Sequence, residues 1–356
     1  MSPPGRPKGE FRSAQHEGSP VSPPGRPKGE FRSAQHEGSP VSMLEVRGLH
    51  KHFKVGRATV KAVDGVDFCI DEGETFALVG ESGCGKTTIA KLVLMLERPS
   101  AGSILFEGED LTRLSAAGLH RYRRQVQAVF QDPYASLNPR LRVRTIVAEP
   151  ILAHERPTKA ALAARVAEVL DVVGLPASAA DLYPHEFSGG QRQRIAIARA
   201  LALKPRCIVL DEPISALDVS IRAQILNLLA DIQQQFKLTY LIIAHDLALV
   251  EHFSNRVGVM YLGNLVETGP TEAVFARPQH PYTRALLASV PRPDPDHLPP
   301  VGAILGEIGS AMAPPPGCKF HPRCPQAMAR CGREVPAWRS TGPAQAAACH
   351  LLEPET

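Results

Sequence analysis

The chain has 356 residues, 44% of them hydrophobic, and a formal net charge of +4. This size allows one large core with a small appended unit, but no apolar stretch approaches the roughly 18 residues that a membrane helix needs. The surplus of positive charge is small and scattered, so we expect no nucleic-acid partner and a cytoplasmic protein that acts at a membrane only through other subunits.

The chain begins with a tandem repeat. Residues 2–21 recur unchanged as residues 22–41, and each copy is rich in Pro, Gly and charged residues. Such a composition buries too little apolar surface to offset the entropy lost on ordering. We therefore expect residues 1–42 to form a disordered tail, with a binding arm as the alternative, and Met43 to open the folded part.

From Met43 onward, short apolar runs alternate with amphipathic segments. The apolar runs predict buried strands at residues 74–80, 126–131, 207–212 and 240–245. Apolar residues at helical spacing predict helices at residues 86–96, 162–173, 191–203 and 221–232. Residues 257–269 predict a β-hairpin that turns at Gly263 and Asn264. The alternation is typical of an α/β fold with a mainly parallel core sheet.

The composition changes again near the C-terminus. Past about residue 275 the sequence becomes Pro-rich and irregular, and four closely spaced cysteines follow. We predict one folded domain over residues 43–275. Residues 276–356 are predicted to form a Pro-rich linker and a small four-cysteine module.

The strongest functional signal lies between the first predicted strand and the first predicted helix. Residues 80–87 fit the phosphate-loop pattern G-x4-G-K-[S/T] in the strand–loop–helix context that it requires. Glycines let backbone N–H groups converge on phosphate oxygens, and the helix N-terminus favours negative charge. Lys86 is predicted to contact the β- and γ-phosphates of ATP, and Thr87 to ligate Mg²⁺. The predicted nucleotide-binding segment is Gly80, Glu81, Ser82, Gly83, Cys84, Gly85, Lys86, Thr87 and Thr88.

Two carboxylates end the predicted strand at residues 207–212. Asp211 and Glu212 would lie beside the phosphate loop, because the carboxyl ends of parallel strands meet at one edge of a sheet. Asp211 suits Mg²⁺ binding and Glu212 suits polarising the attacking water. An Asp-Glu pair alone is weak support for a site, but together with the loop it is strong.

The segment Phe187-Ser188-Gly189-Gly190-Gln191 resembles the signature LSGGQ of ABC ATPases, with Phe in place of the leading Leu. Further family elements follow the expected order along residues 43 to about 270. They match the adenine-stacking aromatic, the Q-loop glutamine, the D-loop and the switch histidine, at Phe53, Gln131, residues 215–218 and His245. The resemblance implies a P-loop ABC-type domain with an antiparallel β part and a helical signature subdomain.

The resemblance also implies the roles of these residues. Glu212 would be the general base, and His245, Gln131 and Lys86 would assist hydrolysis. Gln131 and Asp211 would join Thr87 as Mg²⁺ ligands. Each ATP would lie between two ATPase domains, bound on its far side by the partner's equivalents of Ser188, Gly189, Gly190, Gln191 and Asp218.

A narrower resemblance covers nearly the whole chain after residue 43. Residues 130–140, 280–291 and 314–325, with Cys349-His350, are similar to the ATPases of oligopeptide/dipeptide importers, and to the second of their two ATPase subunits. This implies a second ATPase subunit as a heterodimer partner, two transmembrane permease subunits, an external substrate-binding protein, and a peripheral place at the cytoplasmic face of the membrane. Dipeptides, oligopeptides, nickel and glutathione all remain as cargo.

The cysteine cluster consists of Cys318, Cys324, Cys331 and Cys349, spaced C-x5-C-x6-C-x17-C. In a reducing compartment a metal site is favoured over disulfides. The pattern lacks the tight C-x2–4-C spacing of structural zinc sites, whereas iron–sulfur clusters accept looser spacings. The similar importer ATPases hold a 4Fe–4S cluster here, which we expect. Zn²⁺, with His321 or His350 as a substitute ligand, and free thiols remain alternatives.

Two rival functions fit less well. ABC ATPases of DNA repair insert hundreds of coiled-coil residues between the phosphate loop and the signature, whereas about a hundred residues separate the two here, without sustained heptads. A redox or metal sensor built on the four cysteines would leave the complete set of ATPase motifs unexplained. We therefore expect the ATP-hydrolysing subunit of an importer.

Overall fold

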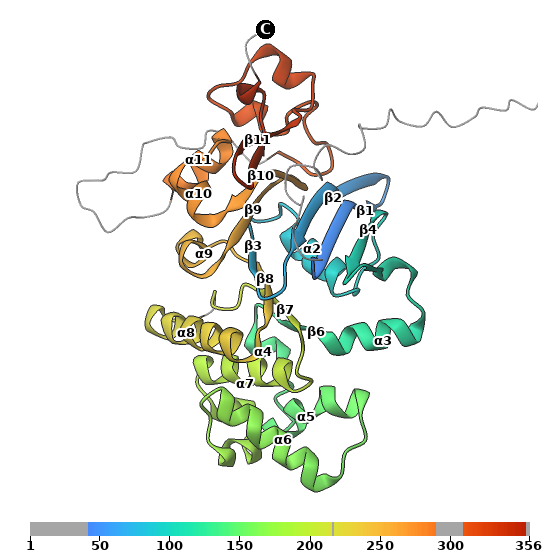
Figure 1. The fold of residues 1–356 in the computed structure, drawn as a ribbon, viewed down its shortest axis with the longest axis vertical. Coiled ribbons are helices and arrows are strands. Elements are labelled where there is room, and N and C mark those ends of the chain that lie inside the picture. The colour runs from blue at the N-terminus through green and yellow to red at the C-terminus, as the bar shows by residue number, and fades with distance from the viewer. Residues whose placement is uncertain (1–41, 216, 290–308, 354–356) are drawn as a thin grey trace, which may run out of the picture. The chain divides into compact units, whose positions relative to one another are not determined.

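The computed structural model describes residues 42–215, 217–289 and 309–353. The predicted tail at residues 1–41 and most of the predicted Pro-rich linker lie outside the described residues. Within the described part, two sheets and the helices around them are traced in Figure 1.

The first sheet is antiparallel, with the strand order β2-β1-β4-β5. Its long strands pair along most of their length, so that Leu44 lies opposite Ile70 and Phe53 opposite Val60. The residues that face the core are apolar and fully buried, which is what holds this sheet against the rest of the fold. The strands are β1 (Leu44–Val55), β2 (Ala58–Ile70), β4 (Ala101–Phe106) and β5 (Glu109–Asp110).

The second sheet has eight strands in the order β11-β12-β10-β9-β3-β8-β7-β6. The neighbours from β9 to β6 are parallel, and the other pairs are antiparallel. The apolar runs are explained by burial of every residue of β3, β7 and β8. The predicted α/β fold is thus confirmed. The strands are β3 (Thr75–Val79), β6 (Val126–Val129), β7 (Cys207–Asp211), β8 (Thr239–Ile243), β9 (Arg256–Tyr261), β10 (Asn264–Pro270), β11 (Trp338–Gly342) and β12 (Gln345–Ala348).

The helices between α4 and α7 pack on one another, and α7 also contacts α8. The four predicted helices correspond to α2, α6, α7 and α8. No helix among the described residues is long and apolar enough to cross a membrane. The helices are α2 (Lys86–Val93), α3 (Ala116–Gln125), α4 (Pro133–Ser136), α5 (Val143–His154), α6 (Lys159–Val172), α7 (Gly189–Leu201), α8 (Val219–Phe236), α9 (Leu247–Phe253), α10 (Thr271–Ala276) and α11 (Pro281–Ala288).

The β9–β10 hairpin differs by one residue from the prediction. Its two-residue turn is Leu262-Gly263, with φ angles of 41° and 80°, and Asn264 already pairs with Tyr261. A type I′ turn requires positive φ at both central residues. Asn264 instead uses its side-chain amide to donate to the backbone carbonyl of Asp64 at 2.5 Å, which keeps it in the strand.

The C-terminal segment continues the main sheet. β12 pairs with β10, placing Ala347 opposite Glu267, and β11 pairs with β12 at the edge. Before these strands lie two short 3-10 turns that carry or flank cysteines, η4 (His321–Arg323) and η5 (Ala329–Gly332). The division predicted at residue 276 stays a prediction. The remaining 3-10 turns are η1 (Leu111–Arg113), η2 (Ala177–Asp181), η3 (Pro184–Glu186) and η6 (His350–Leu352).

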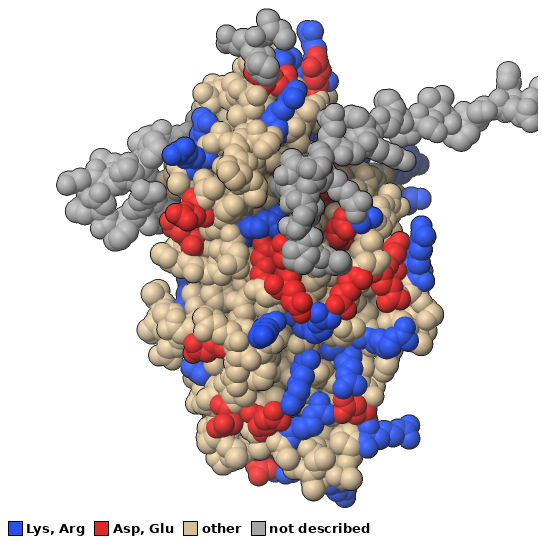
Figure 2. Space-filling view, viewed as in Figure 1, with Lys and Arg blue, Asp and Glu red and all other residues tan. Residues whose placement is uncertain are grey.

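The surface mixes both signs of charge. Figure 2 shows Lys and Arg side chains lying beside Asp and Glu side chains over much of the face in view. Several such neighbours form ion pairs, among them Arg124 with Glu155 at 2.6 Å and Lys51 with Glu97 at 2.7 Å. Exposed pairs of this kind contribute little to stability, so the fold depends mainly on its buried apolar residues.

Candidate functional site

The loop between β3 and α2 has two positions that only glycine can occupy. Gly80 and Gly85 have φ angles of 147° and 111°. A Cβ atom at either position would lie 2.2 Å from a backbone oxygen, that of Met260 or that of Ala62. These glycines let the loop backbone pass close to its neighbours, and a glycine backbone of this kind allows loop N–H groups to approach a phosphate.

Lys86 lies folded back over this loop. Its side chain is only 6% exposed, and its ammonium group donates to the carbonyl oxygens of Gly80 at 2.7 Å and Glu81 at 3.0 Å. The N-terminus of α2 begins at Lys86 and has no side-chain cap. A buried cation beside an uncapped helix N-terminus is suited to an anion such as a phosphate group.

Asp211, at the end of β7, fits a divalent cation. Its side chain is buried, and burial, reinforced by the neighbouring Glu212, raises the pKa of its carboxyl. A hydrogen bond from Thr87 opposes this shift. Among the residues that the structure describes, the Asp211 Oδ1 atom has no hydrogen-bond partner. A buried carboxylate oxygen without a partner, next to a threonine hydroxyl, matches the oxygen ligands that Mg²⁺ prefers.

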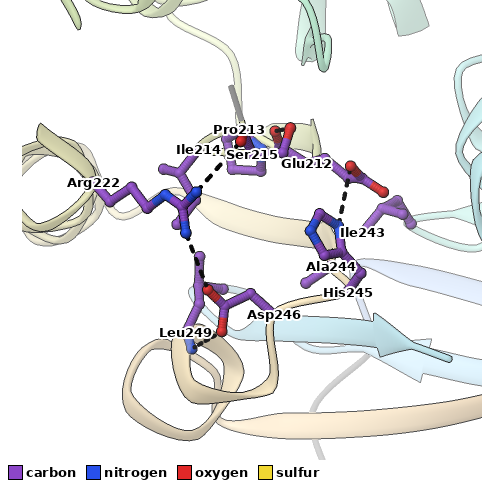
Figure 3. A pocket seen from close by; sticks show the side chains of 10 residues that line it. All are labelled: Glu212, Pro213, Ile214, Ser215, Arg222, Ile243, Ala244, His245, Asp246 and Leu249. Atoms are coloured by element: carbon purple, nitrogen blue, oxygen red, sulfur yellow. Dashed lines mark hydrogen bonds and ion pairs between the residues drawn. The ribbon is translucent and has the colours of Figure 1, made fainter. Parts of the chain in front are cut away.

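Glu212 is contacted by two other predicted site residues. Gln131, just beyond β6, donates from Nε2 to Glu212 Oε2 at 2.7 Å. His245 Nδ1, just beyond β8, lies 3.1 Å from the same oxygen, a contact drawn in Figure 3. The Glu212 backbone has φ of 48°, a left-handed conformation that is strained for this residue. Three strands therefore bring these side chains to one edge of the sheet.

Two hollows adjoin this group. One has a volume of about 320 Å³ and is lined by Phe130, Gln131, Asp132, Ala135, Ser136 and Asp211. The other, drawn in Figure 3, lies between the D-loop and the residues after β8. There Arg222 donates to the Leu217 carbonyl at 2.7 Å and pairs with Asp246 at 3.8 Å, a link that no motif indicated.

The signature segment lies at the start of α7. Ser188 is exposed and caps the helix, accepting from Gln191 N–H at 3.4 Å, while its own N–H donates to Gln191 Oε1 at 3.0 Å. Gly190 is buried, and a Cβ there would lie 2.5 Å from the Ile221 side chain, so glycine permits the α7–α8 packing. Asp218, which precedes α8, is also exposed. Of the predicted partner-facing residues, Ser188, Gln191 and Asp218 are therefore exposed on this chain, whereas Gly190 is buried.

Two other predicted features can be located. Phe53 lies on β1, half-buried, with the Lys51 ammonium 4.8 Å from its ring centroid. The four cysteines of the C-terminal cluster are all free. Burial, with a smaller contribution from the other three thiols, raises the pKa of Cys318 to about 11. The structure therefore gathers the four thiols, while their ligand role stays a prediction.

His50, His52 and Asp64 form a further group with metal-ligand chemistry. It is the only group of three such residues, in the described part of the chain, whose ligand atoms all lie within 4.8 Å of one another. Lys319 donates to Asp64 at 3.1 Å, and this cation lowers the pKa of Asp64 to about 2 despite its burial. Because an ammonium group already neutralises Asp64, the group is poorly suited to a second cation.

Comparison with known proteins agrees with this geometry. The profile of the ABC transporter family matches residues 63–215, and that of the oligopeptide/dipeptide transporter C-terminal region matches residues 266–331. YkfD of Bacillus subtilis (strain 168) is 51% identical over 313 residues, which cover 87% of this chain and 95% of YkfD. This chain belongs to the oligopeptide/dipeptide family of ABC transporter ATP-binding proteins.

Two more relatives define the limits of the likeness. The oligopeptide transport ATP-binding protein AppF of Bacillus subtilis is 48% identical over 322 residues, covering 87% of this ABC ATPase and 97% of AppF. The ATP-binding cassette MJ0796, solved as a dimer in a post-hydrolysis state with ADP and Pi, is 29% identical with a TM-score of 0.59. It covers 64% of this chain and 99% of its own, so the likeness to that structure concerns the ATPase domain.

The ABC ATPase also contains site contacts that sequence reasoning missed. Tyr282, on α11, accepts a hydrogen bond from the Glu81 N–H at 2.9 Å, and Arg323 forms an ion pair with the Glu81 carboxylate at 2.7 Å. Glu81 is part of the phosphate loop, but its two partners are far along the chain. The similarity of residues 280–291 and 314–325 to importer ATPases was a signal that these segments matter, although not of where they bind.

His280 predicts a pH dependence of stability. It is 1% exposed, its Nδ1 accepts from the Tyr282 N–H at 3.0 Å, and burial lowers its pKa from 6.5 to about 3. The unfolded chain therefore binds a proton below pH 6.5 that the folded chain does not, and stability falls as pH falls through this window. Between pH 7 and 5.5, we expect the unfolding free energy to drop about 1 kcal/mol more than in His280→Asn.

Urea unfolding at the two pH values measures this difference. Asparagine keeps a capping side chain at the start of α11 but cannot titrate. The exposed His252→Asn is the matched control and should behave as the wild type. An equal loss in the wild type and His280→Asn would show that His280 is not the responsible group.

Proposed function

We propose that this ABC ATPase drives the import of di- or oligopeptides through two separate permease subunits, with an external protein that delivers the substrate. The observation that carries the proposal is the match of residues 266–331 to the C-terminal region of oligopeptide/dipeptide transporters. AppF, whose name states oligopeptide transport, is similar over nearly its whole length. Peptides are therefore favoured over nickel and glutathione as cargo.

The proposed working unit is a pair of ATPase subunits at the cytoplasmic face of the membrane. In a head-to-tail pair, the exposed start of α7 on one chain would face the phosphate loop of its partner, placing Ser188 and N–H groups at the γ-phosphate. The dimeric state of MJ0796 supports such a pair. We propose that the partner is a second, different ATPase subunit.

The proposed hydrolysis follows from the positions of the side chains. The loop N–H groups and Lys86 hold the phosphates, and Thr87, Asp211 and Gln131 would hold Mg²⁺. When bound, Mg²⁺ neutralises charge on the phosphate oxygens. Glu212 accepts a proton from the attacking water, and His245, which already contacts that carboxylate, senses the γ-phosphate.

Uptake of a labelled tripeptide tests the peptide assignment. Cells that lack this gene should not take up the tripeptide, and the wild-type gene should restore uptake while a hydrolysis-deficient Glu212→Gln gene should not. Uptake of a free amino acid serves as the control for membrane energy. If the wild-type gene restored uptake of nickel or glutathione but not of the tripeptide, that compound and not a peptide would be the cargo.

We also propose that the four C-terminal cysteines bind a 4Fe–4S cluster. Four free thiols gather in a region with few buried side chains, where ligation would supply folding energy. The C-x5-C-x6-C-x17-C spacing favours a cluster over a zinc site, which usually has tight C-x2–4-C pairs.

Purification without oxygen tests the cluster. We expect a brown protein with about four irons and four sulfides per chain. Cys324→Ser should lose this colour, whereas Cys69→Ser, at a buried cysteine of the main domain, should keep it. A colourless wild-type protein with stoichiometric Zn²⁺ would exclude the iron–sulfur assignment without affecting the ATPase.

A further inference from the structure

Glu81, the second residue of the phosphate loop, is held from outside the loop at both its backbone and its side chain. Its N–H donates to the Tyr282 hydroxyl at 2.9 Å. Its carboxylate accepts from both terminal nitrogens of Arg323, at 2.7 Å and 2.9 Å. These partners lie 201 and 242 residues further along the chain, so the C-terminal region anchors the loop.

The Arg323–Glu81 pair is partly shielded from water, because Arg323 is buried and only 19% of the Glu81 side chain is exposed. The Arg323 side chain is 7% exposed, and one of its nitrogens also donates to the Tyr261 hydroxyl at 3.3 Å. A bidentate pair of this kind fixes geometry more strictly than an exposed ion pair. Removing Glu81 would leave the buried Arg323 charge without its partner. The pair therefore holds the Glu81 carboxylate in one place.

Arg323 owes its position to the cysteine module. It is the last residue of η4 and directly precedes Cys324. Phe320, just before this turn, is buried, with its ring centroid 5.3 Å from that of Tyr261 and 5.4 Å from that of Tyr282. The aromatic contacts dock the module, and η4 then directs the guanidinium at the loop.

Within the loop, Glu81 in turn contacts Lys86. The Glu81 carbonyl accepts the Lys86 ammonium at 3.0 Å and the Cys84 N–H at 3.3 Å. Displacement of Glu81 would therefore displace the cation that binds phosphate. A continuous set of contacts leads from η4, through one carboxylate and one carbonyl, to the ammonium of Lys86.

We propose that the C-terminal cysteine module sets the nucleotide affinity of this ATPase through Arg323, which positions Glu81 and, through it, Lys86. Arg323 is a positioning residue, because it contacts the loop and not the substrate. The inference requires only the nucleotide site, and holds whichever metal or cargo the protein binds. Coupling between two sites is reciprocal, so bound nucleotide must also stabilise the module.

Titration of the full-length chain with a fluorescent ATP analogue and Mg²⁺ tests the proposal. We expect Arg323→Gln to weaken binding about tenfold. The affinity of Arg323→Lys should lie between those of this variant and the wild type. Lysine keeps the positive charge but cannot form the two parallel hydrogen bonds of the guanidinium. In the assembled transporter, Arg323→Gln should raise the KM for ATP and leave kcat nearly unchanged, since Glu212 and His245 lie on other elements.

A matched control and a double-mutant cycle separate this effect from general damage. Arg333→Gln removes the same charge from an exposed position of the module and should leave affinity unchanged. Glu81→Gln, Arg323→Gln and the double variant Glu81→Gln/Arg323→Gln should bind about equally weakly, because each of them breaks the same pair. The double variant also removes both charges of the pair, so it remains measurable if Arg323→Gln alone fails to fold.

Hydrogen exchange tests whether bound nucleotide stabilises the cysteine module. In the wild type, MgATP should slow amide exchange in residues 318–332, and in Glu81→Gln/Arg323→Gln this protection should disappear. The proposal is overturned by wild-type affinity in a folded Arg323→Gln protein or in the double variant. An equal loss in Arg333→Gln, multiplicative losses in the cycle, or module exchange that nucleotide does not change would also overturn it.

Discussion

Replacing Glu212 by glutamine is expected to lower the rate of ATP hydrolysis about 10²- to 10⁴-fold, the usual contribution of a general base. The amide matches the carboxylate in size and can still accept the Gln131 hydrogen bond, but it cannot take a proton from water. ATP binding should therefore survive, and the paired subunits should stay closed on ATP. Phosphate release from the assembled transporter, with ATP-analogue binding in parallel, measures both effects.

The exposed Glu251→Gln, on α9, is the matched control. It removes one carboxylate from an exposed position outside the site and should keep the wild-type rate. If Glu212→Gln hydrolyses ATP at nearly the wild-type rate, the proton acceptor is another group and the contacts from Gln131 and His245 serve only to order the site.

The parts of the site that the sequence predicted depend on short segments of the chain. Gly80 and Gly85 fall within eight residues, and both are required by close backbone contacts. Glu212 and His245 each follow a short, fully buried apolar strand, and parallel strands end at the same edge. Burial on both faces produced the apolar runs, and so these strands and the edge that carries the site could be anticipated.

The parts that the sequence did not predict depend on contacts between distant residues. Nothing near Arg323 shows that its partner is Glu81, because an arginine beside a cysteine equally suits a solvated surface. The pairing of β12 with β10 also joins distant residues. Residues 345–348 are too few and too weakly patterned to predict a strand, and their partner Glu267 lies far earlier in the chain. The β9–β10 turn lies one residue before its predicted position, because the Asn264 side chain donates to a carbonyl of β2.

Replacing Lys86 by alanine is expected to weaken ATP binding about 10- to 100-fold, as loss of a hydrogen bond between charged groups would. Two of the three Lys86 ammonium donors bind the Gly80 and Glu81 carbonyls, and the third, directed at Cys84 Sγ at 3.7 Å, would turn to the phosphates. Hydrolysis should fall because ATP is no longer retained, whereas Glu212→Gln should retain ATP and lose only turnover. Equilibrium titration with the fluorescent analogue distinguishes the two variants.

Lys91→Ala provides the control for Lys86→Ala, because Lys91 is an exposed lysine on the same helix and its loss removes the same charge. It should bind nucleotide as the wild type does. Equal weakening in both variants would mean that general positive charge at α2 attracts the nucleotide, and that the buried position of Lys86 has no special role. Unchanged affinity in Lys86→Ala would place the phosphates elsewhere. A loop that held them would bind more weakly once its lysine was removed.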